Sequence, residues 1–160
     1  MIGFLERLFA RGQPAVSDAS PRDAAAMAAL HAASFRRGWS DGEFESLLLE
    51  RNTVAHRAMS GNKLVGFILS RLAAGEAEIL SVAVSSRWQG RGLGGALLQR
   101  HLRQLAGLSV RTVFLEVDED NMPARRLYLR AGFREVARRP GYYQQEGGNA
   151  TALVLRRDLG

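Results

Sequence analysis

Apolar and polar positions recur with two different periods along the first half of the chain, and these periods predict two helices followed by antiparallel strands. Ser20 and Pro21 begin the first helix, because serine caps a helix and proline fits its first turn. Ser60-Gly61-Asn62-Lys63 separates two apolar runs and indicates a hairpin turn. The expected helices span residues 20–35 and 40–50, and the expected strands span residues 53–59, 64–71 and 77–84.

The second half of the chain alternates helices with strands, which is typical of an α/β domain with a helical crossover. A helix over residues 92–106 is ended by Gly107, and a helix over residues 121–130 has Pro123 in its first turn. The strand at residues 112–117 is apolar nearly throughout, so we expect it to be central and covered on both faces. The last expected elements are strands at residues 133–138 and 152–157, with a loop at residues 142–149 between them.

These elements fit one domain over residues 14–160, preceded by an N-terminal extension over residues 1–13. Ile2, Leu5 and Phe9 share one face of a short amphipathic helix in the extension. The extension lacks the apolar core and the cleavage site of a signal peptide. We expect this helix to dock on its own domain or on a partner, and weak membrane attachment is the alternative.

The composition of the 160 residues excludes several kinds of site. There is no cysteine, so disulfides, thiolate nucleophiles and cysteine-based zinc sites are excluded. The three histidines, His31, His56 and His101, lack metal-ligand spacing, so no metal is expected. No apolar run is long enough to span a membrane.

The net charge of +6 comes almost wholly from arginine, since Lys63 is the only lysine. Arginine suits contacts to phosphates and carboxylates. A basic chain fits nucleic acid, a ribosomal neighbour or an anionic cofactor. The chain has no RNA-binding motif and no basic run interleaved with aromatic residues, so direct nucleic-acid binding is not expected.

A glycine-rich loop joins the strand that ends at Val84 to the helix over residues 92–106. Its sequence is Gln89-Gly90-Arg91-Gly92-Leu93-Gly94-Gly95. Glycines let a backbone approach an anion closely, and the free N–H groups of the first helical turn point at that anion. The loop therefore predicts a site for a phosphate or pyrophosphate group.

Gly90-x-Gly92-x-x-Gly95 also satisfies the dinucleotide fingerprint, with Glu116 at a strand end downstream. A Rossmann-type oxidoreductase is disfavoured because about three strands precede the loop, too little chain follows to complete a parallel sheet, and no second substrate domain exists. A P-loop is excluded because no Gly-Lys-Ser/Thr follows. A glycine turn without a ligand is disfavoured because glycine destabilises the first turns of a helix.

Gln89-x-x-Gly92-x-Gly94 resembles the pyrophosphate loop of the GNAT superfamily of N-acetyltransferases, and the resemblance extends over residues 18–159. It implies the GNAT fold, an α/β domain whose central, mixed, mostly antiparallel sheet of about six to seven strands is flanked by about four helices. In this family a bulge splays the fourth strand from the fifth and opens a V-shaped cleft. The implied cofactor is acetyl-CoA, with coenzyme A as the product.

Within the superfamily, the chain is most similar to the RimI branch, the ribosomal-protein-alanine N-acetyltransferases. The similar segments are Leu115-Glu116-Val117, the helix from Asn121 through Leu127-Tyr128 to Gly132-Phe133, and Arg138-Arg139 followed by Tyr142-Tyr143. The chain departs from the branch at residues 140–141 and 146–149, which lie where the substrate would bind.

The resemblance assigns the cofactor site to the glycine loop, the strand before it and the last helix. The loop would hold the pyrophosphate where the helix dipole favours negative charge, and the strand would offer backbone groups to the pantetheine amides. Each of these roles has an alternative without a ligand. Arg91 would be an exposed loop residue, Val82 and Val84 would only fill the core of the strand, and Asn121 would only cap its helix. The implied cofactor-binding residues are Val82, Ala83, Val84, Gln89, Gly90, Arg91, Gly92, Leu93, Gly94, Gly95 and Asn121.

Glu116 and Tyr128 are the implied catalytic residues. Glu116 stands among apolar residues of a central strand, where a carboxylate is costly unless it is used or paired. Burial disfavours its charged form, so it suits a general base that deprotonates the amine directly or through one water. A salt bridge to a neighbouring arginine is the alternative. The hydroxyl of Tyr128 would protonate the departing thiolate, and a core tyrosine on an amphipathic helix is the alternative.

Trp39, Tyr142 and Tyr143 are the implied substrate-binding residues of a peptide groove, and packing in the core or at a sheet edge is the alternative. The resemblance implies a cytoplasmic enzyme, a monomer or weak dimer with no membrane span. It would acetylate the N-terminal α-amine of a protein such as a ribosomal protein. Two alternatives remain, a GNAT enzyme acting on a small-molecule amine and a non-catalytic acetyl-CoA-binding module.

Overall fold

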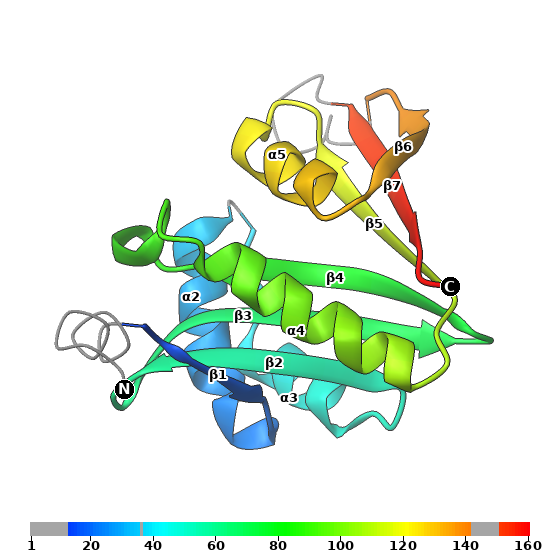
Figure 1. The fold of residues 1–160 in the computed structure, drawn as a ribbon. Coiled ribbons are helices and arrows are strands. Elements are labelled where there is room, and N and C mark those ends of the chain that lie inside the picture. Colours follow the sequence, from blue (N-terminus) through cyan, green and yellow to red (C-terminus); the bar gives the residue numbers. More distant parts are fainter. Residues whose placement is uncertain (1–12, 36, 142–150) are drawn as a thin grey trace, which may run out of the picture.

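The computed structural model describes residues 13–35, 37–141 and 151–160, which form one sheet with helices on both faces (Figure 1). The strand order is β1-β2-β3-β4-β5-β7-β6, and every neighbouring pair is antiparallel except β4 and β5, which are parallel. The mixed, mostly antiparallel sheet that the sequence predicts is therefore confirmed. The strands are β1 (Ala15–Asp18), β2 (Thr53–Ser60), β3 (Lys63–Ala73), β4 (Glu76–Val84), β5 (Thr112–Asp118), β6 (Arg134–Arg139) and β7 (Ala152–Asp158).

The helices begin largely where the sequence predicts. Ser40 caps α3, because its hydroxyl accepts a hydrogen bond from the Glu43 backbone N–H at 3.1 Å. The first predicted helix starts as a 3₁₀ turn, in which the Asp23 carboxylate accepts from the Ser20 backbone N–H at 2.8 Å. No described helix is long and apolar enough to cross a membrane. The described helices are η1 (Pro21–Asp23), α2 (Ala24–Ser34), α3 (Asp41–Leu49), η2 (Ser86–Trp88), α4 (Leu93–Gly107) and α5 (Met122–Arg130).

Strand β1 is absent from the sequence prediction. It is an edge strand that pairs with β2 from Ala15 opposite Met59 to Asp18 opposite His56. Four residues are too few for alternation to identify a strand, so pairing with β2 decides its conformation. The predicted amphipathic helix of the N-terminal extension lies outside the described residues.

Two separate hydrophobic clusters fill the two faces of the sheet. On one face, Leu97 of α4 and Tyr128 of α5 pack in one cluster with Leu115 of β5. On the other face, Phe44 of α3 packs with Phe67 of β3 in a cluster that draws on α2, α3, β2, β3 and β4. Figure 1 shows β5, β6 and β7 extending beyond α2 and α3. Within the part of the chain that the structure describes, one face of this half of the sheet therefore lacks a covering helix.

Among the described residues, helices cover only one face of the central strand β5, so the expectation of two covered faces is wrong. Val113 and Leu115 are buried against the α4 and α5 cluster, whereas Phe114 and Glu116 are partly exposed on the opposite face. The apolar run at residues 112–117 suggests two covered faces because it contains Phe114. The ring of Phe114, however, is covered by a guanidinium rather than by a helix. Arg156 lies 5.5 Å from the centre of that ring.

Strands β4 and β5 separate halfway along β4. Their parallel pairing ends at Ile79 and Leu115. At the same place the register between β3 and β4 shifts and leaves Leu80 without a partner in β3, which is a β-bulge. Figure 1 shows β5 turning away from β4 beyond this point. The V-shaped splay between strands four and five is therefore confirmed.

Candidate active site

The glycine loop leads from the end of β4 into the N-terminus of α4. Gly90 and Gly92 have φ angles of +76° and +83°, which side chains of L-residues rarely adopt. A Cβ atom added at Gly90, Gly92 or Gly95 would meet nothing within 4 Å, so the space beside the loop is open. The first turn of α4 has N–H groups without helical acceptors at this loop. The residues present therefore fit a pyrophosphate group.

Two side chains of the loop make contacts within the protein. Gln89 donates a hydrogen bond from Nε2 to the backbone carbonyl of Val84 at 3.0 Å, which ties the loop to the end of β4. The Arg91 guanidinium lies 5.0 Å from the centre of the Trp88 ring, a cation–π contact. Arg91 is exposed, as the alternative interpretation has it, and its contact with phosphate stays a prediction.

The start of α4 is anchored in the core. Leu93 is buried in the cluster that joins α4 and α5 to the sheet. A Cβ atom added at Gly94 would meet Leu127 Cδ2 at 3.4 Å and Val84 Cγ2 at 3.9 Å, so this glycine faces α5 and the end of β4. Leu93 and Gly94 thereby fix the helix terminus whose N–H groups face the loop.

The last residues of β4 combine core side chains with an unpaired backbone edge. Val82 and Val84 pack against the cluster under α4, and Ala83 is buried in the cluster under α2 and α3. The β5 pairing stops before these residues, so β5 leaves their edge of the strand to an extended ligand. Core packing and cofactor binding are compatible here, because the side chains pack in the core and the backbone groups would bind the cofactor.

Glu116 projects from the face of β5 opposite the buried Leu115. Its side chain is 23% exposed, so the expectation of an acid buried among apolar residues is wrong. The neighbours that bury Leu115 belong to the other face of the strand. The Glu116 Oε1 atom lies 2.9 Å from Nη1 of Arg139, which is the salt bridge that the sequence leaves as the alternative. Pairing and a role as base are compatible, because a carboxylate has a second oxygen.

Glu116 lines a cavity of about 350 Å³ on the face that α2 and α3 leave uncovered. The β4 residues that line it belong to the half of β4 paired with β5, and Glu116 is the first β5 residue beyond that pairing, so the cavity lies at the closed end of the splay. Its charged and aromatic members come from four strands and place acidic and basic groups together. They are Arg71, Glu76, Glu78, Phe114, Glu116 and Arg139.

Tyr128 lies on the other side of the sheet from Glu116, in the cluster beneath α4 and α5. It is 7% exposed, and its ring meets Phe133 edge-on with ring centres 5.7 Å apart. Burial raises the pKa of the Tyr128 hydroxyl to about 12. The tyrosine is a core residue, as the alternative has it, and it stays protonated at neutral pH.

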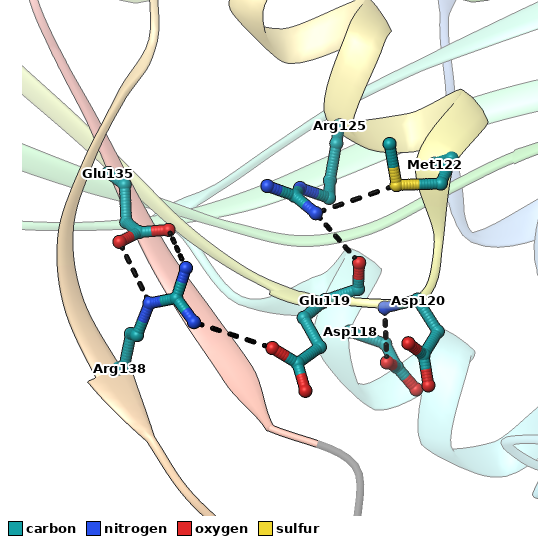
Figure 2. Close-up of polar contacts among 7 residues, drawn as sticks. All are labelled: Asp118, Glu119, Asp120, Met122, Arg125, Glu135 and Arg138. Atoms are coloured by element: carbon teal, nitrogen blue, oxygen red, sulfur yellow. Dashed lines mark hydrogen bonds and ion pairs between the residues drawn. The ribbon is translucent and has the colours of Figure 1, made fainter.

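Polar contacts hold the loop that runs from β5 to α5 (Figure 2). Arg125 of α5 donates to the Glu119 backbone carbonyl at 2.9 Å, and Arg138 of β6 reaches the Glu119 carboxylate at 3.5 Å. Asn121 caps α5, since its Oδ1 accepts from the Ala124 N–H at 3.2 Å. Asn121 therefore does cap its helix, and the contact of Asn121 with the cofactor stays a prediction.

The predicted substrate-binding residues are only partly described. Trp39 is half-buried, stacks on His31 with ring centres 4.9 Å apart and packs against the cluster of α2 and α3. Its backbone N–H donates to His31 Nδ1 at 3.1 Å, and burial lowers the pKa of that histidine. Core packing therefore accounts for Trp39, and its role in a groove stays a prediction. Tyr142 and Tyr143 lie outside the described residues.

Arg139 is the site residue that sequence reasoning misses. It belongs to a motif that the sequence analysis quotes for its resemblance, yet no role follows from spacing alone. The feature of the sequence that could have indicated a role for Arg139 is its position next to the end of a predicted strand, from which a long side chain can reach across the sheet. Only the strand order shows that it crosses toward Glu116.

A splayed mixed sheet with an open glycine cradle defines an acyl-CoA-dependent transferase architecture, and the comparisons agree. The Acetyltransferase (GNAT) family matches residues 24–133. The chain is 35% identical to ribosomal protein bS18-alanine N-acetyltransferase of Haemophilus influenzae over 73% of its own length and 80% of the relative. It is 37% identical to N-alpha-acetyltransferase RimI of Mycobacterium tuberculosis over 76% and 77% of the two chains. The protein belongs to the GNAT acetyltransferase family.

A solved structure supports the same assignment. The crystal structure of ribosomal-protein-S18-alanine N-acetyltransferase from Escherichia coli superposes with a TM-score of 0.85 at 26% identity, covering 92% of this chain and 94% of that one. The chain is therefore a RimI-like N-acetyltransferase in sequence and fold, and it uses acetyl-CoA as its cofactor. These findings confirm the predicted family, enzyme class and cofactor.

Proposed function

We propose that this protein acetylates the N-terminal α-amine of a ribosomal protein, the counterpart of bS18. The observation that carries the proposal is the position of Glu116, whose carboxylate faces a cavity of about 350 Å³ beside the splay. An α-amine entering from this open face would meet a carboxylate before it met the core. The relatives named for acetylating bS18 alanine support this acceptor. A ribosomal acceptor also places the enzyme in the cytoplasm.

Acetyl-CoA supplies an activated acetyl thioester, and the chain's residues supply binding and proton transfer. Residues 90–95 and the first turn of α4 hold the pyrophosphate, with positive φ angles at Gly90 and Gly92 keeping the approach open. The unpaired edge of β4 at residues 82–84 holds the pantetheine arm.

Two residues on opposite faces of the sheet handle the protons. Glu116 accepts a proton from the acceptor amine, directly or through one water. An N-terminal amine has a pKa of about 7.7–8.0, so a modest base suffices. Tyr128 donates its hydroxyl proton to the departing sulfur, and burial keeps that hydroxyl protonated until the pH approaches its pKa of about 12.

A second candidate acceptor is a small cationic amine. The observation that favours it is the presence of Glu76 and Glu78 in the same cavity as Glu116, because several carboxylates attract a compact polycation. Arg71 and Arg139 line the cavity too and oppose this attraction. The open face and the RimI-like sequence therefore favour a protein N-terminus.

The test is mass spectrometry of an acceptor panel incubated with protein and acetyl-CoA. The panel contains peptides with alanine, serine, methionine or glycine at the N-terminus, including the N-terminal sequence of the organism's own bS18, together with polyamines. A matched peptide with a blocked N-terminus and an internal lysine separates α-amine from side-chain acetylation. We expect modification of the free alanine peptide only at its α-amine. Modification of polyamines alone would reject the proposal and favour the small-amine candidate.

A further inference from the structure

Arg139 and Glu116 are joined across an intervening strand. Strand β7 lies between β5 and β6, with Val154 of β7 opposite Glu116 and Ala152 opposite Arg139. The Arg139 side chain therefore crosses β7 to bring Nη1 within 2.9 Å of Glu116 Oε1. Both residues line the same cavity. The ion pair is thus part of the wall that an acceptor amine would approach.

The two partners differ in exposure in a way that separates their tasks. The Arg139 side chain is 56% exposed and lies toward solvent, whereas the Glu116 side chain is 23% exposed and lies deeper. A guanidinium offers five N–H donors and no acceptor, so it can hold a carboxylate oxygen but cannot take up a proton. Arg139 can therefore hold and orient the carboxylate without competing with it for the proton of the amine.

We infer that Arg139 is a positioning residue that fixes the Glu116 carboxylate so that its second oxygen, Oε2, faces the acceptor amine. The inference rests on the role of Glu116 in the proposed function. A general base needs its acceptor atom within hydrogen-bond reach of the proton it takes, and a third group commonly orients it. Glu116 would otherwise choose among several rotamers at a half-open cavity.

Exposed ion pairs contribute little to folding, so the loss of Arg139 leaves the fold intact. The same strand provides a matched control. The side chain of Arg134 of β6 is 65% exposed and pairs with Asp158 at 3.7 Å, and neither residue lines the cavity. Removing its charge changes the strand in the same way without touching Glu116.

The experiment compares Arg139→Gln, Arg139→Lys and Arg134→Gln in steady-state kinetics with the alanine peptide. Mispositioning a catalytic group costs between about tenfold and 100-fold in rate, so we expect a loss of this size in kcat for Arg139→Gln. The KM for acetyl-CoA should not change, because no residue of the glycine loop lines the cavity that Arg139 lines. Arg139→Lys should recover part of the rate, and Arg134→Gln should match the wild type. Equal rates for Arg139→Gln and Arg134→Gln would overturn the inference.

A double-mutant cycle with Glu116→Gln shows whether Arg139 acts through Glu116. If it does, Arg139→Gln lowers the residual rate of Glu116→Gln no further. If the double variant loses rate by the product of the two single-variant losses, Arg139 does not act through Glu116. That result would overturn the inference while leaving Glu116 as the base. Normal turnover of Glu116→Gln alone would overturn the role of Glu116 in the proposed function. Inactive Glu116→Gln beside fully active Arg139→Gln would overturn the positioning role alone.

Discussion

The Nδ1 atoms of His56 and His101 lie 2.8 Å apart, and both side chains are fully buried between β2 and α4. At this distance one Nδ1 atom carries a proton and donates it in a hydrogen bond, and the other Nδ1 atom accepts. His101 Nε2 lies 2.6 Å from Ser70 Oγ, and His56 Nε2 lies 2.8 Å from Gln104 Oε1. Because a glutamine oxygen only accepts, His56 donates there, His101 donates to His56, and Ser70 donates to His101.

The histidine pair predicts that the protein loses stability in mild acid. Burial lowers the pKa of His101 from 6.5 to about 3, with the neighbouring His56 as the second cause. Burial also lowers the pKa of His56. The hydrogen bond that His56 donates to Gln104 and the charge of Asp18 act against this, while Arg100 acts with burial. Below pH 6.5 the unfolded chain therefore binds more protons than the folded one. For His101, the free energy of unfolding should fall by roughly 1.4 kcal/mol in total between pH 7.5 and pH 5.5, and by up to roughly 1.4 kcal/mol per pH unit below that. His56 should add to this fall in the same direction.

Urea denaturation between pH 7.5 and pH 5.5 measures this slope, above the range where most carboxylates titrate. The control is the double variant His56→Gln/His101→Gln, whose amides keep hydrogen-bonding capacity but do not titrate. It should be less stable at pH 7.5 yet show a shallower dependence on pH. A slope as steep as that of the wild type would show that other groups cause the acid sensitivity.

Replacing Gly92 by alanine should weaken acetyl-CoA binding. Gly92 has a φ of +83°, and its Cβ would occupy the open space beside the loop, where the pyrophosphate is proposed to bind. Gly75 is the matched control, since its φ is +81° and its Cβ would also meet nothing within 4 Å, but it lies in the turn between β3 and β4. Both variants should lose about 1–2 kcal/mol of stability from the left-handed conformation. Isothermal titration should show a weaker Kd for Gly92→Ala only, and equal affinities would contradict the loop assignment.

Tyr128→Phe should lower kcat between about 100-fold and 10,000-fold if the hydroxyl is the general acid. The ring and its packing against Phe133 are retained, so the melting temperature should change little. With a pKa of about 12, Tyr128 stays protonated in ordinary assays, so wild-type kcat should not fall through ionisation of this tyrosine below pH 10. Stopped-flow turnover of both proteins across pH 6–10 tests both points. Normal kcat for the phenylalanine variant would leave Tyr128 as a core residue only.

Glu116→Gln should lower kcat by a similar factor while acetyl-CoA binds as tightly as before, because the amide cannot take a proton. Glu135→Gln is the matched control, since Glu135 forms an ion pair with Arg138 at 3.0 Å on β6 and does not line the cavity. Titration calorimetry measures cofactor binding, and the peptide assay measures turnover. Comparable turnover of the two variants would exclude Glu116 as the base.

Local chemistry let the sequence predict most elements and the cofactor loop. The hydroxyl of Ser40, the amide of Asn121 and the glycines at 90 and 92 act on backbone groups within a few residues, so their patterns are visible in the chain. The sequence does not show in the same way that the Trp39 ring stacks on His31, because that contact forms only when α2 and α3 have packed together.

The sequence by itself determined the order of elements, the phosphate-binding loop and the family, because these depend on residues that are neighbours along the chain. The tertiary structure decided which face of β5 is open, and hence that Glu116 is partly exposed and paired with Arg139. It also decided that His56 and His101, which are 45 residues apart, share a hydrogen bond. These relationships follow from strand order and from which helices cover which face. Both are set by non-local packing, which no local pattern along the chain records.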